Sequence, residues 1–409
     1  MQRVFDMIFP WFWALVWFTL PLSIRANSVS LIAFGLVALG NALYHKPRFN
    51  RHQLILASLF LLLFAWLVLG PLIADGSLPA WKLTERKLSL VAIPLLLLLV
   101  SGTRDDLSKW AIRGLFAGLV LSGVHMLAVA GLKMIQGQPA EAFTYHAFTG
   151  RYALGAIYYS FYLSAALYYL AFRQTEPFIA RYRLFLGIFF LALLLFSASK
   201  LFIVLSLPAI IFPFLKIIRQ MSGIKKYLLP VLLLIVLLFG SIPFLNRVSE
   251  LKNTDLNVVT QDRFRYDTPL NGLTFRMLLW RLAGEIMADE NAWLTGTGID
   301  NSQETLDHYY ARYGIYTGNP DLGDTGYLGY NFHNQFLETM VGSGIPGLLL
   351  LLAIIPGVFL FTKKAFFFPV LFYIVTFIFF MTESVLERQA GLVFFCLLWN
   401  FNEDNSFQD

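Results

Sequence analysis

The sequence predicts an all-α protein, a polytopic integral membrane bundle of about twelve spanning helices with one large loop outside the membrane. Of its 409 residues, 57% are hydrophobic and only 14% are charged, whereas a soluble domain usually carries about 25% charged residues. Apolar runs such as 89–100 and 227–239 contain almost no side chain that water would solvate, and a spanning helix needs roughly 20 mostly apolar residues. The composition therefore excludes soluble enzymes, fibrous proteins and disordered chains.

Helices are expected for all of these segments, because an open chain can satisfy its backbone polar groups in lipid only as a helix. The predicted spans fall near residues 5–23, 28–44, 53–73, 87–101, 108–135, 152–172, 182–198, 200–217, 226–245, 344–362, 365–382 and 389–401. With the N-terminus inside, the inner segments hold sixteen Lys and Arg residues and the short outer segments hold eight. This excess of positive charge predicts that both termini lie inside.

One long loop, residues 246–331, is large enough to be a small domain, and it separates spans one to nine (1–245) from spans ten to twelve (332–409). It holds 12 acidic and 7 basic residues and no Ser/Gly-rich tract, so it is expected to be folded. The apolar spacing of 273–289 predicts a short amphipathic helix within it. The stretches 296–302 and 318–331, rich in Gly, Asn and Asp, predict loops.

Ionisable side chains are almost absent from the span interiors, where His125 is the main exception. Ion-coupled transporters place carboxylates or histidines at mid-membrane depth, so their absence disfavours transport. His125 is expected to be a core histidine satisfied by a neighbouring helix. No motif for nucleotides or metals is present, so no metal or cofactor is expected. No dense basic block indicates nucleic acid as a partner.

Charged residues gather instead at the predicted outer ends of the spans. If the bundle is compact, these ends converge on one outward-facing cavity beneath the long loop; taken singly, each is also explained as a side chain that extends to the membrane surface. The members are Arg86, Lys87, Arg151, Lys200, Arg276, His333, Glu383, Glu387 and Arg388.

Helical geometry separates Arg276 from its neighbour Arg281. At about 100° per residue, Arg276 shares its face with apolar residues and is predicted to face the membrane or the bundle. The apolar residues on that face are Trp280, Ala283 and Met287. Arg281 lies on the other face, with Glu285 as an i,i+4 partner. Because an arginine on a buried face is costly unless an anion pairs with it, Arg276 is the candidate ligand-binding residue.

His333 lies where the long loop meets the next apolar run, within the sequence FHNQFLE at 332–338. A histidine at this junction can accept a proton from a substrate hydroxyl near neutral pH, as a general base does. It can equally be an interfacial histidine beside an Asn helix cap. The residue pattern alone leaves both interpretations open.

Together these features resemble a known family. The residues Arg276 and Trp280, the stretches 293–298 (WLTGTG) and 333–337 (HNQFL), and the sequence GIPG at 344–347 look like the conserved module of the O-antigen ligase and O-antigen polymerase superfamily. The module would cover about residues 270–362. A late, large loop among about twelve spans extends the resemblance to nearly the whole chain.

The resemblance implies a metal-independent, inverting glycosyltransferase in the bacterial inner (plasma) membrane, with its long loop and active site facing the periplasm. Its donor would be a glycan on undecaprenyl pyrophosphate and, in the ligases, its acceptor a sugar hydroxyl of lipid A–core. His333 matches the family histidine proposed to activate the acceptor hydroxyl, and Arg276 matches a loop arginine that contacts the pyrophosphate. Lys200 stands where many members have an arginine, which is a departure because lysine lacks the bidentate fork. Arg86 resembles a basic position before the fourth span.

Other functions stay open at this point. A polymerase for O-antigen or exopolysaccharide shares the donor and fold and uses another lipid-linked glycan as acceptor, and a protein-glycosylating ligase is a third variant. A flippase or small-solute permease is the rival from another class. A purely structural role in the membrane would not explain why Arg276 lies on the apolar face of the predicted helix at 273–289.

Overall fold

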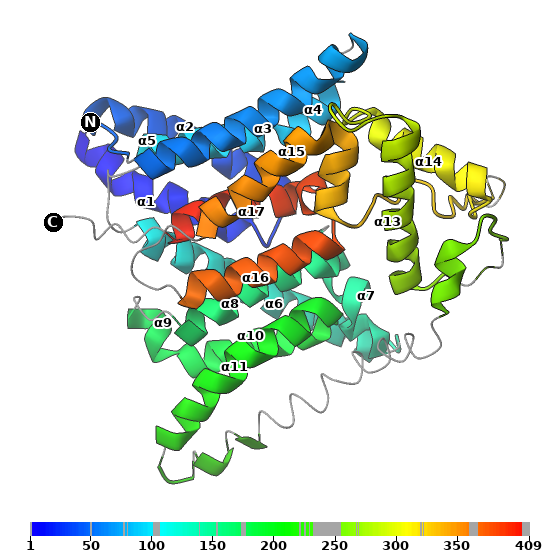
Figure 1. Ribbon diagram of the computed structural model, residues 1–409. Coiled ribbons are helices and arrows are strands. Elements are labelled where there is room, and N and C mark those ends of the chain that lie inside the picture. The colour runs from blue at the N-terminus through cyan, green and yellow to red at the C-terminus, as the bar shows by residue number, and fades with distance from the viewer. Residues whose placement is uncertain are drawn as a thin grey trace.

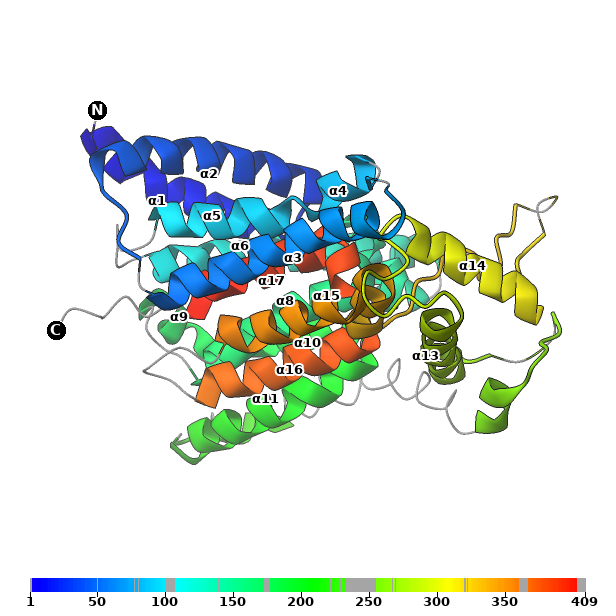
Figure 2. The ribbon, with the colours of Figure 1, turned by 45° about the horizontal axis from the view of Figure 1, so that its top comes forward.

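This computed structural model describes residues 2–402, apart from 50, 77, 80, 101–106, 139, 153, 173–176, 221, 225, 229, 232–254, 267, 269, 320, 322 and 360–366. The part of the chain so described is helical, with one isolated bridge between Asn319 and Asp324 as its extended pairing. Helices α1 to α11 and α15 to α17 form a bundle, and α13 and α14 lie together at one end of it (Figures 1 and 2).

The elements follow one another in this order: α1 (Gln2–Thr19), α2 (Ile24–Tyr44), α3 (Arg51–Asp75), α4 (Trp81–Lys87), α5 (Ser89–Val100), α6 (Leu107–Ile135), η1 (Ala140–Phe143), α7 (Tyr145–Thr149), η2 (Gly150–Tyr152), α8 (Gly155–Phe172), α9 (Pro177–Arg181), α10 (Arg183–Phe196), α11 (Lys200–Gln220), η3 (Leu256–Thr260), α13 (Gly272–Asp289), α14 (Asn301–Tyr313), α15 (Gln335–Phe359), α16 (Phe367–Thr382), η5 (Val385–Glu387) and α17 (Gln389–Asn402).

Four helices within the described residues are long and apolar enough to cross a membrane: Ile24–Tyr44, Arg51–Ala74, Leu107–Ile135 and Gln335–Phe359. Shorter apolar helices cover Arg183–Phe196, Val370–Thr382 and Gln389–Trp399. The all-helical prediction is confirmed, and these helices indicate a multi-pass membrane protein. The count of twelve spans stays a prediction, and most of the expected ninth span, 226–245, lies outside the described residues.

The centre of the bundle is aromatic. Phe161 of α8 contacts rings from three other helices, with ring centroids 4.9 Å from Phe379, 4.9 Å from Phe394 and 5.6 Å from Phe202. Such tilted and edge-to-face pairs add attraction beyond the apolar area that they bury. This core joins α8, α11, α16 and α17, and it fixes the end of α16 from which the candidate site is built.

The tight turn predicted near residue 200 separates α10 from α11. Ala198 lies in this turn with φ +49°, a left-handed conformation that non-glycine residues seldom adopt. His125 is satisfied as expected, since its Nδ1 lies 2.6 Å from the Tyr152 hydroxyl. That partner comes from the short η2 segment rather than from a neighbouring helix.

The described part of the long loop has its own apolar core, formed chiefly by α13, α14 and η3. Helix α13 matches the predicted helix at 273–289 and begins with a capping box between Asn271 and Thr274. Helix α14 was not predicted, and its first residues replace part of the loop expected at 296–302. On its outer side, Arg312 and Tyr309 donate hydrogen bonds to Asp289 and hold the pKa of that carboxyl below its usual value.

A close backbone contact at a glycine joins the loop domain to α15. The helix begins at Gln335, nine residues before the expected start of the tenth span, and it kinks at Gly344, where φ is +70°. A Cβ at Gly344 would lie 2.2 Å from the Leu294 carbonyl oxygen, so only glycine allows this approach. Backbone hydrogen bonds from Ile345 to Trp293 and from Thr297 to Val341 complete the junction. The sequences WLTGTG and GIPG therefore contact each other directly.

Candidate functional site

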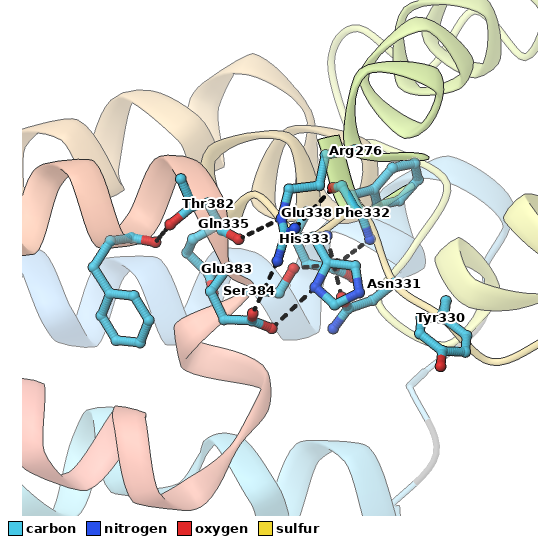
Figure 3. Close-up of polar contacts among 12 residues, drawn as sticks. Arg276, Tyr330, Asn331, Phe332, His333, Gln335, Glu338, Thr382, Glu383 and Ser384 are labelled. Carbon is cyan, nitrogen blue, oxygen red and sulfur yellow. Dashed lines mark hydrogen bonds and ion pairs between the residues drawn. The ribbon is translucent and has the colours of Figure 1, made fainter. Parts of the chain in front are cut away.

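Three segments meet where the loop domain joins the bundle: the start of α13, the residues before α15, and the turn between α16 and α17. Figure 3 shows side chains from all three pointing toward one another. The segments are far apart in sequence, and the apolar cores on both sides hold them in place.

His333 occupies the segment before α15. Its φ is +46°, and its backbone N–H donates to Asn331 Oδ1 at 3.1 Å. The next residue, Asn334, caps α15 by accepting from the backbone N–H groups of Phe336 and Leu337. The Asn cap considered for this histidine is therefore present.

The ring of His333 is paired with a carboxylate. Nδ1 lies 3.2 Å from Glu383 Oε1, and the two side chains are only 21% and 14% exposed. When Nδ1 carries the proton and donates it to Glu383, Nε2 keeps the lone pair that a general base needs. This arrangement can accept a proton from a bound hydroxyl and stabilise the imidazolium that results.

Arg276 reaches the same carboxylate from α13. Its Nε donates to the Thr382 carbonyl at 3.1 Å, and Nη2 lies 4.0 Å from Glu383 Oε2. Arg276 was predicted to face the membrane or the bundle, and its bond to Thr382 shows that it faces the bundle. Arg281 does not take part in the site: as expected, its Nε donates to Glu285 at 2.7 Å within the loop domain. Glu383 thus lies between the two predicted site residues, Arg276 and His333 (Figure 3).

Glu338, in the first turn of α15, connects two of the three segments of the site. Its Oε2 accepts from the Phe332 backbone N–H at 3.3 Å and from the Ser384 hydroxyl at 2.9 Å, and the residue is buried. Nearby, Gln335 Oε1 accepts from the Leu386 N–H at 2.6 Å. These bonds tie the residues flanking His333 to those flanking Glu383, so they fix the spacing of that pair.

Lys87 reaches the same turn from the junction of α4 and α5. Its Nζ donates to the Leu386 carbonyl at 3.1 Å and forms an ion pair with Glu387. It is buried, whereas the neighbouring Arg86 is exposed. A small cavity of about 30 Å³ lies here, lined in part by Lys87, Glu338 and Gln335. Of the two adjacent basic residues, the structure directs Lys87 inward.

Two further predicted cations belong to other segments of the chain. Lys200 is the first residue of α11, half-buried, and α11 begins at the end of the bundle that carries α13 (Figure 1). The side chain of Arg151 lies outside the described residues. Among the described residues, no group of three or more His, Cys, Asp or Glu side chains is arranged to hold a metal ion.

One protein family resembles the middle of the chain. Residues 184–352 match the family model described as O-Antigen ligase. Over this stretch the chain is similar to the O-antigen ligase family. No curated protein matches the sequence. The matched stretch overlaps most of the module expected at 270–362 and supports a glycosyltransferase-like membrane enzyme.

The stretch that matches the O-antigen ligase family holds Lys200, Arg276, His333 and Glu338, but it ends before the turn that carries Glu383. The site therefore combines the matched stretch with helices on both sides of it. Reasoning from sequence placed Glu383 in the outer cluster without a role and did not single out Glu338. The one signal for Glu338 is an acidic residue in the first turn of a helix after an Asn cap.

Proposed function

We propose that the protein transfers a glycan from undecaprenyl pyrophosphate to a sugar hydroxyl of lipid A–core, as an O-antigen ligase at the periplasmic face of the bacterial inner membrane. The observation that carries the proposal is the Glu383–His333 pair beside Arg276, at the end of a membrane bundle whose middle stretch is similar to the O-antigen ligase family. A lipid-linked donor fits this location, because its polyprenyl tail remains in lipid while its pyrophosphate and sugars lie at the loop domain.

In the proposed reaction, His333 Nε2 removes the proton from the acceptor hydroxyl as the oxygen attacks the anomeric carbon of the donor. The bond between that carbon and the pyrophosphate oxygen breaks on the opposite face, so the configuration inverts. Undecaprenyl pyrophosphate leaves with the bonding electron pair. Arg276 stabilises the negative charge that develops on it, and Lys200, at the start of α11, is the further cation of the proposal. Glu383 orients the imidazole and stabilises its protonated form.

A strain of the source organism that lacks the protein tests this function. Its lipopolysaccharide is separated on a gel, and the glycan retained on undecaprenyl pyrophosphate is measured in parallel. Core without any O-chain, together with long polymer on the carrier, is the result expected of a ligase. Core bearing a single repeat would instead establish a polymerase. An unchanged profile would contradict both and favour another glycan or a transporter.

Arg276→Lys keeps the charge but removes the planar fork and its bond from Nε to Thr382. We expect the KM for the lipid-linked donor to rise by about tenfold or more, because lysine offers a point charge where arginine binds phosphate through two parallel N–H groups. Donor kinetics with purified protein in proteoliposomes provide the measurement. Arg281→Lys is the matched control on the same helix, and its donor KM should stay normal. Equal donor KM values for Arg276→Lys and wild type would exclude the bidentate role.

A further inference from the structure

A second pocket lies within the loop domain, away from the His333 site. Its volume is about 230 Å³, far above the roughly 10–15 Å³ that one water requires. Its walls come from two segments of the chain, and three tyrosines line it: Tyr266, Tyr316 and Tyr327. The other lining residues are Phe264, Arg265, Thr268, Leu270, Ile315 and Gly326. Tyr266 is 78% exposed, so its ring stands at the mouth of the pocket.

The walls of this tyrosine pocket are fixed by backbone contacts. The Phe264 N–H donates to the Tyr313 carbonyl at 2.8 Å, and the Tyr327 N–H donates to the Tyr316 carbonyl at 2.9 Å. Gly326 has φ +55°, and a Cβ there would lie 2.4 Å from the Tyr316 carbonyl oxygen. These backbone contacts therefore hold the pocket in its concave shape.

Aromatic rings connect the tyrosine pocket to the candidate active site. The ring of Tyr327 lies 4.5 Å from Phe275, Phe275 lies 5.7 Å from Tyr330, and Tyr330 lies 5.9 Å from His333, measured between centroids. Figure 3 shows Tyr330 on the loop-domain side of His333. Tyr330 is exposed and Phe275 is buried, so the buried ring of Phe275 packs the wall of the pocket against the exposed tyrosine beside His333.

Polar groups accompany the rings. The Tyr316 hydroxyl donates to Asp324 Oδ2 at 2.6 Å, and the Gly326 N–H donates to Asp324 Oδ1 at 2.9 Å. These two bonds hold the pKa of Asp324 below its usual value, so the carboxylate is ionised near neutral pH. The bonds of Asp324 thus fix the Tyr316 ring in the wall of the pocket, and Arg265 and Thr268, residue types that hydrogen-bond hydroxyls, also line it. Ring faces attract polarised C–H groups. A pyranose presents both kinds of group.

We propose that the tyrosine pocket binds a sugar residue of a glycan chain whose reacting end lies at His333. This inference rests on the proposed function, since it places a second sugar subsite along the same glycan. The chain would pass over the exposed ring of Tyr330 and would enter the pocket beside Tyr266 and Tyr327. Transfer would then favour glycans long enough to reach the pocket.

Binding of free oligosaccharides tests the subsite without requiring any transfer. The probes are the repeat-unit oligosaccharide released from the carrier by mild acid and the core oligosaccharide released from lipid A, each labelled at its reducing end. Fluorescence anisotropy with the full-length protein in detergent measures Kd. We expect one probe to bind, and Tyr266→Ala to weaken it by about three- to tenfold, the range expected for one aromatic contact.

Tyr227→Ala is the matched control, since Tyr227 is 71% exposed and lies outside the loop domain; its Kd should equal that of the wild type. Binding of the repeat-unit probe would assign the pocket to the donor glycan, and binding of the core probe would assign it to the acceptor. Absence of binding by both probes, or an unchanged Kd in Tyr266→Ala, would overturn the subsite. If the subsite is present but the deletion strain retains normal lipopolysaccharide, only the proposed reaction fails.

Discussion

Replacing His333 should abolish glycan transfer while leaving the protein folded and inserted. We expect turnover to fall by about 10²–10⁴-fold, the usual contribution of a positioned general base. The donor KM should change little, because Arg276 and the other cations remain. Single-turnover transfer from undecaprenyl-pyrophosphate-linked glycan, with purified protein in proteoliposomes, measures both quantities.

The choice of substitution matters because His333 has φ +46°. Alanine in a left-handed conformation costs roughly 1–2 kcal/mol, so His333→Ala combines strain with loss of the base. Asparagine tolerates this conformation better, so His333→Asn isolates the chemical loss. His308→Asn, at an exposed position of α14, is the matched control. Turnover of His333→Asn at the wild-type rate would exclude the histidine as the base.

Features that depend on local spacing were predictable from the sequence. The 100° rotation per residue predicted that Arg276 faces the membrane or the bundle and that Arg281 pairs with Glu285. Arg276 contacts the bundle, and Arg281 donates to Glu285. The tight turn near residue 200 was evident from the small residues 197–199 between two apolar runs. In each case the information lies within a few residues of the chain.

Features that depend on distant partners were not predictable. Glu338 is an ordinary acidic residue in a first helical turn until Phe332 and Ser384 are brought to it, the latter from 46 residues away. Adjacent Arg86 and Lys87 cannot be told apart by spacing in a helix as short as α4. Only the position of the turn at Glu387 directs Lys87 inward.

Helix α14 was missed for a different reason. Its buried face has the helical spacing of Leu306, Tyr309 and Tyr310, but two of these are tyrosines in a polar segment. A tyrosine side chain is favourably buried only when its hydroxyl has a hydrogen-bond partner. Tyr309 donates to Asp289 and Tyr310 donates to the Tyr330 carbonyl, and neither partner is visible in the helix's own sequence.

Glu383→Gln should reduce turnover by about 10²–10⁴-fold with an unchanged or lower donor KM. The amide preserves the shape of the side chain but removes the charge that stabilises protonated His333, and an amide N–H facing Nδ1 would favour the wrong tautomer. An equivalent neutral substitution in a serine protease triad costs about 10⁴-fold. Single-turnover transfer in proteoliposomes, as for His333, separates the two parameters.

The donor KM distinguishes the two possible roles of Glu383, because this carboxylate also lies 4.0 Å from Arg276. If Glu383 mainly orients His333, its neutralisation frees Arg276 for the pyrophosphate, and donor KM does not rise. If it mainly positions Arg276, donor KM rises as in Arg276→Lys while turnover is preserved. Glu285→Gln removes the carboxylate that pairs with Arg281 on α13, the helix that also carries Arg276. It should change neither turnover nor donor KM. A normal turnover in Glu383→Gln would therefore remove the carboxylate from the proposed chemistry and leave His333 to act without it.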